Sequence, residues 1–198
     1  MKVVGLTGGI GSGKTTISRI LRDLGAYIID EDVVSRILMQ KGQKVYDDIV
    51  GYFGDGILKE NGEIDRKKLG SIVFADKEKL QVLNEITHPA MVEYTKREIE
   101  RIISQKKHKL IVIDAAILVE MGLDKLVDEI WVVYVDRSTQ IKRVMARDGL
   151  SYSEALNRIS AQMPAEERLK FGDEIIDNTR PLDEVRAQVE MLFYKAIE

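Results

Sequence analysis

The sequence predicts an α/β fold of three layers, in which helices cover both faces of a five-stranded parallel sheet. Three observations predict it: short apolar β-branched runs recur, helical patterns separate most of them, and a glycine-rich segment joins the first run to a helix. Central parallel strands are buried on both faces, so they read as nearly continuous apolar runs. The expected strands are Lys2–Leu6, Ala26–Ile29, Leu110–Ile113, Ile130–Val135 and Glu174–Ile176.

The first strand leads into the segment Gly8–Thr15, which fits the pattern G-x-x-x-x-G-K-[ST] of phosphate-binding loops. Glycines let the backbone curl so that several N–H groups point at one anion. Lys14 can reach the β- and γ-phosphates of a nucleotide, and the Thr15 hydroxyl can ligate Mg²⁺. The residues expected to bind the nucleotide are Gly8, Gly9, Gly11, Ser12, Gly13, Lys14, Thr15 and Thr16.

The residues after this loop carry the pattern of a helix that packs on the sheet. Apolar residues recur at helical spacing, at Ile17, Ile20, Leu21 and Leu24. Gly25 follows as a C-terminal stop, since glycine readily adopts the left-handed conformation that ends many helices. Strand, glycine-rich loop and helix in this order form the setting that a phosphate-binding loop requires.

Three acidic residues, Asp30-Glu31-Asp32, follow the second expected strand. Ligands of open α/β sheets bind beyond the carboxyl ends of the strands, so these acids are expected at the edge that holds the phosphate loop. A carboxylate there can accept the proton of an attacking hydroxyl. We expect Asp30 and Asp32 to share a face, with Glu31 turned aside. The alternative is that Asp30 caps the helix expected to begin near Val33.

Residues 30–109 separate the second and third expected strands, although a βαβ crossover needs only about a dozen residues. The surplus predicts a helical insertion that holds the substrate. His88-Pro89 is expected at the start of its last helix, because proline suits the first helical position. His88 either holds a ligand or has a structural role. The expected helices are 33–40, 45–53, 67–74, 77–86 and 90–103.

The strand Leu110–Ile113 ends in Asp114, as in a Walker-B element whose aspartate supports Mg²⁺, often through water. The alternative is that Asp114 is an ordinary turn residue. Glu120 follows and is either a second acid in the same cleft or a plain helix residue.

A second surplus segment, residues 137–171, is rich in arginine. Its Ser151-x-x-Glu154 is a capping box, which predicts a helix start. Arg143 and Arg147 are spaced i, i+4, so both guanidinium groups can reach one site. Such arginines on a mobile lid would neutralise a transferring phosphoryl group and exclude water. The alternative is a solvent-facing surface helix. Pro181 then opens the last helix.

Composition excludes several classes of protein. Charged residues make up 32% of the chain, yet the formal net charge is only −3, which argues against a general nucleic-acid binder. The absence of cysteine excludes disulfides, thiolate metal sites and cysteine nucleophiles. The chain enters a strand at once and has no apolar run long enough to span a bilayer, so we expect a cytoplasmic protein.

Taken together, these motifs resemble the dephospho-CoA kinase family over nearly the whole chain. Leu6–Lys14 is similar to the family's phosphate loop, and Ile29–Asp32 is similar to its Asp-Ala-Asp stretch, with Glu31 in place of the alanine. Asp114–Glu120 departs from the family pattern because Ala116 replaces a proline, although Glu120 keeps its place. Further matches follow in family order: Phe53-Gly54, Gly62–Arg66, Leu69, Val73-Phe74, His88-Pro89, Gln140-x-x-Arg143, Arg147-Asp148, Arg158-x-x-x-Gln162 and Asp177-Asn178.

The resemblance implies ATP-dependent phosphorylation of the ribose 3′-hydroxyl of dephospho-CoA, which gives CoA and ADP in the final step of coenzyme A biosynthesis. Asp32 is then the base, and Mg²⁺, held by Thr15 and Asp114, is the cofactor. The cations implied for catalysis are Lys14, Arg143 and Arg147. The residues implied for substrate binding are Asp30, Arg66, His88 and Glu120.

The resemblance further implies a P-loop nucleotide-kinase-like fold with a helical substrate-binding insertion and a small helical lid. The nucleotide-binding core is expected to comprise residues 1–32, 107–136 and 172–198, the CoA-binding lobe residues 33–106, and the lid residues 137–171. We expect ATP and dephospho-CoA as partners, neither nucleic acid nor a membrane, and a monomer or a weak homo-oligomer.

The nearest alternative is another small-molecule kinase of this fold, such as a nucleoside or nucleoside monophosphate kinase. A GTP-dependent switch would need a guanine-reading Asn-Lys-x-Asp stretch, which the sequence lacks. An oligomeric motor ATPase usually needs trans-acting arginines in a larger chain.

Overall fold

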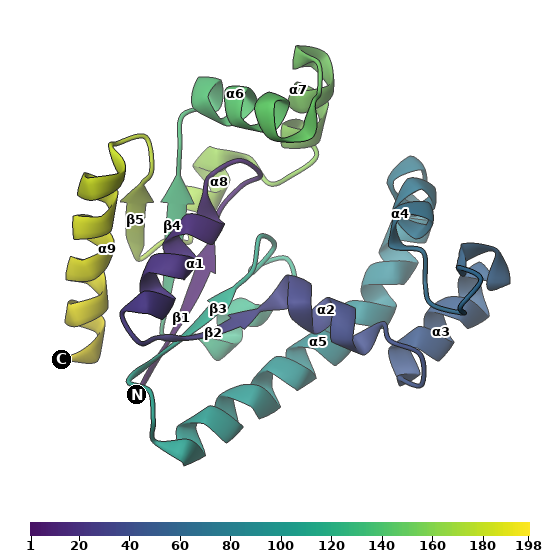
Figure 1. The fold of residues 1–198 in the computed structure, drawn as a ribbon, viewed down its shortest axis with the longest axis horizontal. Coiled ribbons are helices and arrows are strands. Elements are labelled where there is room, and N and C mark those ends of the chain that lie inside the picture. Colours follow the sequence, from purple (N-terminus) through teal and green to yellow (C-terminus); the bar gives the residue numbers. More distant parts are fainter. The chain divides into compact units, whose positions relative to one another are not determined.

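All five expected strands form one parallel sheet in the order β2-β3-β1-β4-β5 in the computed structural model, which describes residues 1–198 (Figure 1). The central strand β1 pairs with β3 and β4, so that Leu6 lies opposite Asp114 on one side and Trp131 on the other. Because all strands run the same way, their carboxyl ends meet at one edge, where ligands bind in such sheets. The strands are β1 (Lys2–Thr7), β2 (Tyr27–Asp30), β3 (Leu110–Asp114), β4 (Glu129–Tyr134) and β5 (Glu174–Asp177).

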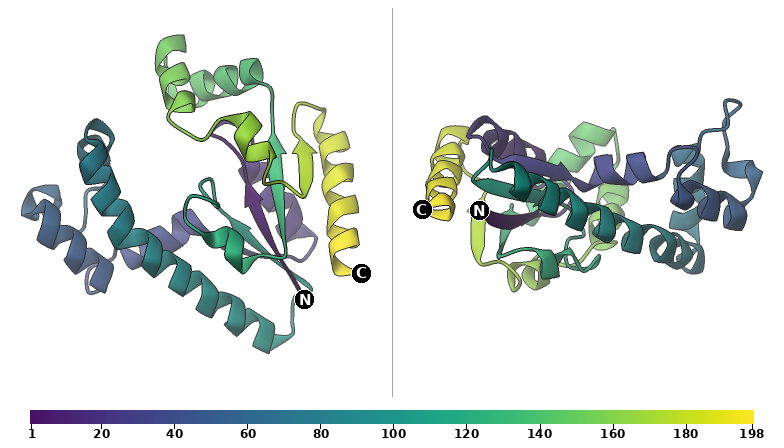
Figure 2. Two further views of the ribbon diagram at one scale, coloured as in Figure 1. Left: turned by 180° about the vertical axis from the view of Figure 1, so that it is seen from behind. Right: turned by 90° about the horizontal axis from the view of Figure 1, so that it is seen from below.

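The two faces of the sheet have different coverings. Val4 and Leu6 of β1 belong to the main core, which also includes side chains of α1 (Lys14–Asp23) and α9 (Leu182–Ile197). Between them, Gly5 points to the opposite face, where an added Cβ would lie 2.7 Å from Leu118 Cδ2. The short helix α8 (Ala165–Leu169) also lies on that second face (Figure 2). The result is the three-layer arrangement that the apolar runs predicted.

The chain divides into two compact units, one of Met1–Asp30 with Ile99–Glu198 and the other of Glu31–Glu98. The first unit holds the sheet and all of residues 137–171. The second is helical. The remaining elements are α2 (Glu31–Leu38), α3 (Lys44–Phe53), η1 (Asp55–Ile57), α4 (Arg66–Ala75), α5 (Lys77–Gln105), η2 (Leu123–Leu126), α6 (Arg137–Asp148) and α7 (Tyr152–Ser160).

The helical unit has an apolar core of its own. The Tyr46 ring is buried, and its hydroxyl donates a hydrogen bond of 2.5 Å to the Gly62 carbonyl, so the turn before α4 is fixed to α3. Asp65 caps α4 by accepting from the backbone N–H groups of Lys67 and Lys68. The buried side chains of this core are Val45, Tyr46, Ile49, Ile57, Ile64, Leu69 and Val73.

A third, small core joins α6 to α7. Ile141 and Val144 of α6 pack with Ala155 and Ile159 of α7, and Ile10 of the glycine-rich loop packs against this cluster. The capping box at Ser151 and Glu154 is confirmed, with both reciprocal hydrogen bonds present. The loop is thus attached to residues 137–171 by apolar contact as well as by the polar bonds described below.

The expected helix break at His88-Pro89 is wrong. Helix α5 runs without interruption from Lys77 to Gln105, and Pro89 lies inside it. Proline in a helix interior removes one backbone hydrogen bond and usually ends or kinks the helix. Here the apolar residues on both sides of Pro89, among them Ile86 and Ala90, pack against the same core. Burial of one continuous apolar face therefore outweighs the lost bond.

Smaller differences concern helix ends. Helix α2 begins at Glu31 rather than Val33, and Pro181 occupies the N-cap of α9 rather than its first helical position. Gly25 follows the end of α1 with φ of 101°, as its role as a stop signal predicts. None of the helices combines the length and apolar composition that crossing a bilayer requires.

We predict that Leu6→Ala lowers the free energy of unfolding by about 2–5 kcal/mol, because it opens a cavity in the centre of the sheet. Leu6 is 0% exposed. Urea denaturation followed by circular dichroism measures the change. Met191→Ala is the control, since Met191 is 62% exposed and its loss should cost less than about 0.5 kcal/mol. Equal effects of the two substitutions would contradict this account of the core.

Candidate active site

The glycine-rich loop between β1 and α1 has the backbone geometry of an anion cradle. Gly11 and Gly13 have φ values of 75° and 87°, in the left-handed region that glycine adopts without strain. The loop closes on itself through a hydrogen bond of 3.0 Å from Ser12 N to Gly9 O. Helix α1 begins directly afterwards at Lys14, so its positive dipole end adjoins the loop. Sequential N–H groups and a helix N-terminus together favour phosphate.

Asn178 holds the loop from the carboxyl end of β5. Its side-chain amide is buried and donates a hydrogen bond of 2.6 Å to the Ser12 carbonyl. A Cβ on Gly13 would lie only 2.1 Å from Asn178 Nδ2. Two features therefore require glycine at position 13: its backbone conformation and the close approach of the Asn178 amide.

Arg143 of α6 reaches the same point. Its guanidinium donates to the carbonyl of Ser12 at 3.3 Å and to the carbonyl of Asn178 at 3.0 Å. Both acceptors are backbone oxygens, so the positive charge itself has no carboxylate partner in these bonds. The structure thus places a cationic group from residues 137–171 directly at the phosphate loop.

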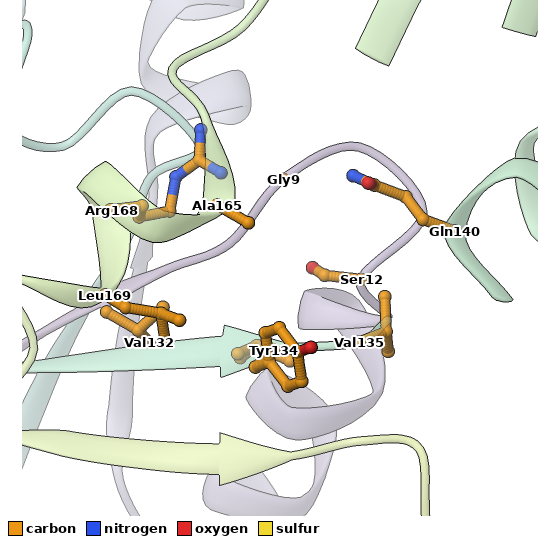
Figure 3. Close-up of a pocket in the computed structure, with 10 residues that line it drawn as sticks. Gly9, Ser12, Val132, Tyr134, Val135, Gln140, Ala165, Arg168 and Leu169 are labelled. Carbon is orange, nitrogen blue, oxygen red and sulfur yellow. The ribbon is translucent and has the colours of Figure 1, made fainter. Parts of the chain in front are cut away.

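Two glutamine side chains clamp the tip of the loop at Ile10. Gln140 Nε2 donates to the Ile10 carbonyl at 2.8 Å, and the Ile10 N–H donates to Gln162 Oε1 at 2.7 Å. Figure 3 shows Gln140 reaching the loop from α6. Because the N–H and the carbonyl of Ile10 are both bonded, the tip of the loop is fixed without a nucleotide.

Lys14 forms an ion pair with Asp114 at the end of β3. The second oxygen of Asp114 accepts a hydrogen bond from the Ser18 hydroxyl of α1. The Asp114 side chain is 8% exposed and that of Lys14 17% exposed. A buried charge pair of this kind fixes the direction of the lysine, because leaving either charge alone would be costly. The expected acid after the third strand is therefore beside the loop.

The residues around Lys14 suit a magnesium ion that is bound mainly through nucleotide phosphates. Thr15 is exposed at the first turn of α1, with its hydroxyl side chain accessible to a ligand. No cluster of three or more His, Cys, Asp or Glu side chains could hold a metal without other ligands. Mg²⁺ in nucleotide sites keeps several waters and takes only one or two protein ligands. The donor set therefore fits this ion.

The acids after β2 occupy three different environments. Asp30 lies opposite Asp114 in the register of β2 and β3, so both are at the carboxyl edge of the sheet. Glu31 is buried at the start of α2, and its carboxylate accepts a hydrogen bond of 2.6 Å from Thr95 Oγ1 of α5. Asp32 is exposed on the first turn of α2.

Within the helical unit, Asp32 belongs to a group of charges that includes two arginines. Partial burial and the neighbouring charge of Arg36 lower the pKa of Arg66, whereas the Asp32 carboxylate raises it. Arg36 and Arg66 repel each other and are both attracted to Asp32, so the group is suited to an anionic ligand. Arg36 was missed from the sequence, although it lies four positions after Asp32 on α2.

Arg143 and Arg147 have different partners: Arg143 bonds the loop, whereas Arg147 bonds its neighbour Asp148. Arg147 pairs with Asp148 through two hydrogen bonds of 2.8 and 3.0 Å, and its side chain is 58% exposed. Arg158 of α7 also bonds Asp148, at 2.9 Å. The bond from Arg147 lowers the pKa of Asp148. These local ion pairs engage the Arg147 guanidinium at Asp148.

The other two candidates for substrate binding have different positions. His88 is half-buried within helix α5, one residue before Pro89. Glu120 is exposed in the turn that follows β3, not in a helix. Its charge acts on Arg168 of α8, since it raises the pKa of that guanidinium against the lowering effect of burial.

Four of the residues that surround the loop were not assigned a role from the sequence: Gln140, Gln162, Arg168 and Asn178. Three of them lie in the matched patterns Gln140-x-x-Arg143, Arg158-x-x-x-Gln162 and Asp177-Asn178. Those patterns were the signal in the sequence from which these three residues could have been found. Spacing alone could not reveal their bonds to the loop, because each bond joins residues more than a hundred positions apart.

The parallel sheet, the glycine-rich loop and the Lys14–Asp114 pair define a P-loop nucleotide-binding enzyme of the kinase type. The family model described as dephospho-CoA kinase matches residues 2–184. The chain belongs to the dephospho-CoA kinase family.

Two relatives and one solved structure match this chain over almost its full length. Dephospho-CoA kinase of Carboxydothermus hydrogenoformans is 47% identical, over 98% of this chain and 94% of its own. That of Geobacter sulfurreducens is also 47% identical, over 98% of both chains. The structure of dephospho-CoA kinase from Campylobacter jejuni superposes with a TM-score of 0.73 at 29% identity, covering 98% of this chain and 96% of that one.

We predict that Gly13→Ala weakens ATP binding by at least about tenfold, because the methyl group must displace the Asn178 amide and Ala resists the left-handed conformation. Titration calorimetry with a hydrolysis-resistant ATP analogue measures the effect. Gly149→Ala is the matched control: Gly149 also has positive φ, 66°, but nothing lies within 4 Å of its added Cβ. Equal losses of affinity in the two variants would contradict the prediction. They would show that backbone strain alone, not the contact with Asn178, requires glycine at position 13.

Proposed function

We propose that this chain transfers the γ-phosphate of ATP to the ribose 3′-hydroxyl of dephospho-CoA. The observation that carries the proposal is the fixed phosphate loop with Lys14 directed by Asp114, in a chain of the dephospho-CoA kinase family. The oxygen of the acceptor hydroxyl forms a new bond to the γ-phosphorus, the bond to the β-phosphate oxygen breaks, and ADP leaves. The hydroxyl proton passes to a carboxylate, for which Asp32 is the candidate.

The residues of the loop supply the electrostatic part of this reaction. Phosphoryl transfer requires positioning and charge stabilisation more than covalent help from the protein. Lys14 and Arg143 would stabilise the charge on the transferring group, and the loop N–H groups would hold the remaining phosphates. Arg143 already bonds the loop carbonyl of Ser12, so a small movement of its guanidinium brings it to an anion in the cradle.

Mg²⁺ is the cofactor that we propose for this site. When bound it would neutralise charge on the β- and γ-phosphate oxygens. Thr15 would provide a hydroxyl ligand. Asp114 is already engaged by Lys14 and Ser18, so its support of the ion would pass through water.

We also propose how the work is divided along the chain. Residues 33–106 would bind the acceptor through Arg66 and His88, with Asp30 and Glu120 as contacts from the core, and residues 137–171 would act as a lid over ATP with Arg147 joining Arg143 on closure. Residues 1–32, 107–136 and 172–198 would form the nucleotide-binding core. The protein would work in the cytoplasm as a monomer or weak homo-oligomer.

We predict that ADP release depends on dephospho-CoA. A coupled ADP-release assay compares dephospho-CoA with nucleosides, nucleoside monophosphates and no acceptor. Turnover should be high only with dephospho-CoA and negligible without an acceptor, since a site that excludes water avoids hydrolysis. Preferred turnover of a nucleoside or a nucleoside monophosphate would overturn the assignment in favour of another kinase of this fold.

We predict that Asp32→Asn lowers the turnover number by about 10²–10⁴-fold while ATP affinity stays unchanged, because asparagine cannot accept the proton of the acceptor hydroxyl and the phosphate loop is unaltered. Steady-state kinetics and calorimetry measure the two quantities. Asp48→Asn is the control: Asp48 lies in the same helical unit but is paired with Lys44 on the surface of α3. An unchanged turnover number in Asp32→Asn would remove Asp32 from the role of base.

A further inference from the structure

Arg168 of α8 is a buried cation beside the phosphate loop that the proposed reaction does not yet use. Arg168 is 5% exposed, and its Nη2 atom has no hydrogen-bond partner. A Cβ on Gly9 would lie 3.1 Å from Arg168 Nη1 and 2.8 Å from Gln140 Nε2. The absence of a side chain at Gly9 therefore leaves the room that the guanidinium occupies (Figure 3).

The buried guanidinium of Arg168 is unfavourable unless an opposite charge compensates it. Burial of an arginine without a bonded anion is expensive, since the guanidinium stays protonated in proteins. The opposite charge that acts on it within the protein is that of Glu120, which is exposed and only partly offsets the effect of burial on the pKa of Arg168. Ser12, whose hydroxyl is also buried without a partner, lines the same small cavity.

A water molecule could occupy that cavity but could not neutralise the charge. The cavity measures about 20 Å³, which is room for roughly one water. Arg168 and Ser12, each with an unpartnered buried polar atom, both line it. The positive charge would remain only partly compensated in a region of low dielectric, where it acts on other charges more strongly than it would in water.

We propose that Arg168 is a positioning residue of the nucleotide site, whose buried charge lies against the Gly9 end of the loop and stabilises the polyphosphate of ATP through it. The inference rests on the proposed use of ATP and requires nothing of the acceptor. Gln140 and Gln162 fix the neighbouring residue Ile10 on both sides, so this end of the loop is held in place beside the charge.

The test compares ligands that differ only in the number of phosphates. AMP, ADP and a hydrolysis-resistant ATP analogue are titrated into wild type, Arg168→Gln, Arg168→Lys and the surface control Arg186→Gln, whose guanidinium is on α9 and paired with Glu190. In Arg168→Gln the affinity loss should grow with phosphate number, reaching roughly tenfold for the analogue and staying small for AMP. Arg168→Lys should restore most of the loss, and Arg186→Gln should show none.

Two results would overturn the proposal: an equal loss for all three ligands, which marks a purely structural role, and unchanged affinities. Failure of the kinase assay with dephospho-CoA, together with a graded loss here, would refute the proposed acceptor and leave the role of Arg168 intact.

Thermal melting checks that each variant folds. If Arg168→Gln does not fold, the wild-type protein serves. The side-chain ¹⁵N resonance of Arg168, identified by its absence from the Arg168→Lys spectrum, should shift more with the ATP analogue than with AMP. Equal shifts with the two ligands would overturn the proposal.

Discussion

The register of the parallel sheet is the constraint on which the site depends. Because β1 and β3 are neighbours with Leu6 opposite Asp114, the strand that carries the glycine-rich loop ends beside the strand that carries the acid. Lys14 is the first residue of the next helix, α1, and meets that acid as a buried ion pair. A shift of one residue would turn Asp114 to the other face of the sheet and leave the lysine charge without its partner. Strand pairing thus decides the direction of the lysine side chain at the phosphate loop.

The loop itself is held by side chains from distant parts of the sequence. Asn178 and Arg143 bond the carbonyl of Ser12, and two glutamines bond Ile10. Oriented dipoles stabilise a transferring phosphoryl group best when they need no reorganisation during the reaction. The backbone of the cradle is therefore prepared in advance by α6, by the segment after α7, and by the end of β5.

Local patterns predicted the elements of this fold well, and they predicted its long-range contacts poorly. The apolar runs identified all five strands, and the capping box at Ser151 identified the start of α7. Pro89 led to a wrong prediction of a helix break, because its local effect on the helix was outweighed by an apolar face that continues on both sides of it. Gly9 was recognised as loop backbone, but the buried arginine beside it could not be, because only the packing of α8 brings Arg168 there. Likewise, the i, i+4 spacing of Arg147 could not reveal that Asp148 would bind it.

The contact of Ile10 with the small core of α6 and α7 makes the position of the loop tip depend on the packing of that helical pair. That core contains only Ile141, Val144, Ala155 and Ile159 as buried residues, so it is weak compared with the main core and can open while the sheet stays folded. Each opening would release Ile10 and with it the tip of the loop. The side chains of α6 and α7 thus support the tip of the cradle without belonging to it.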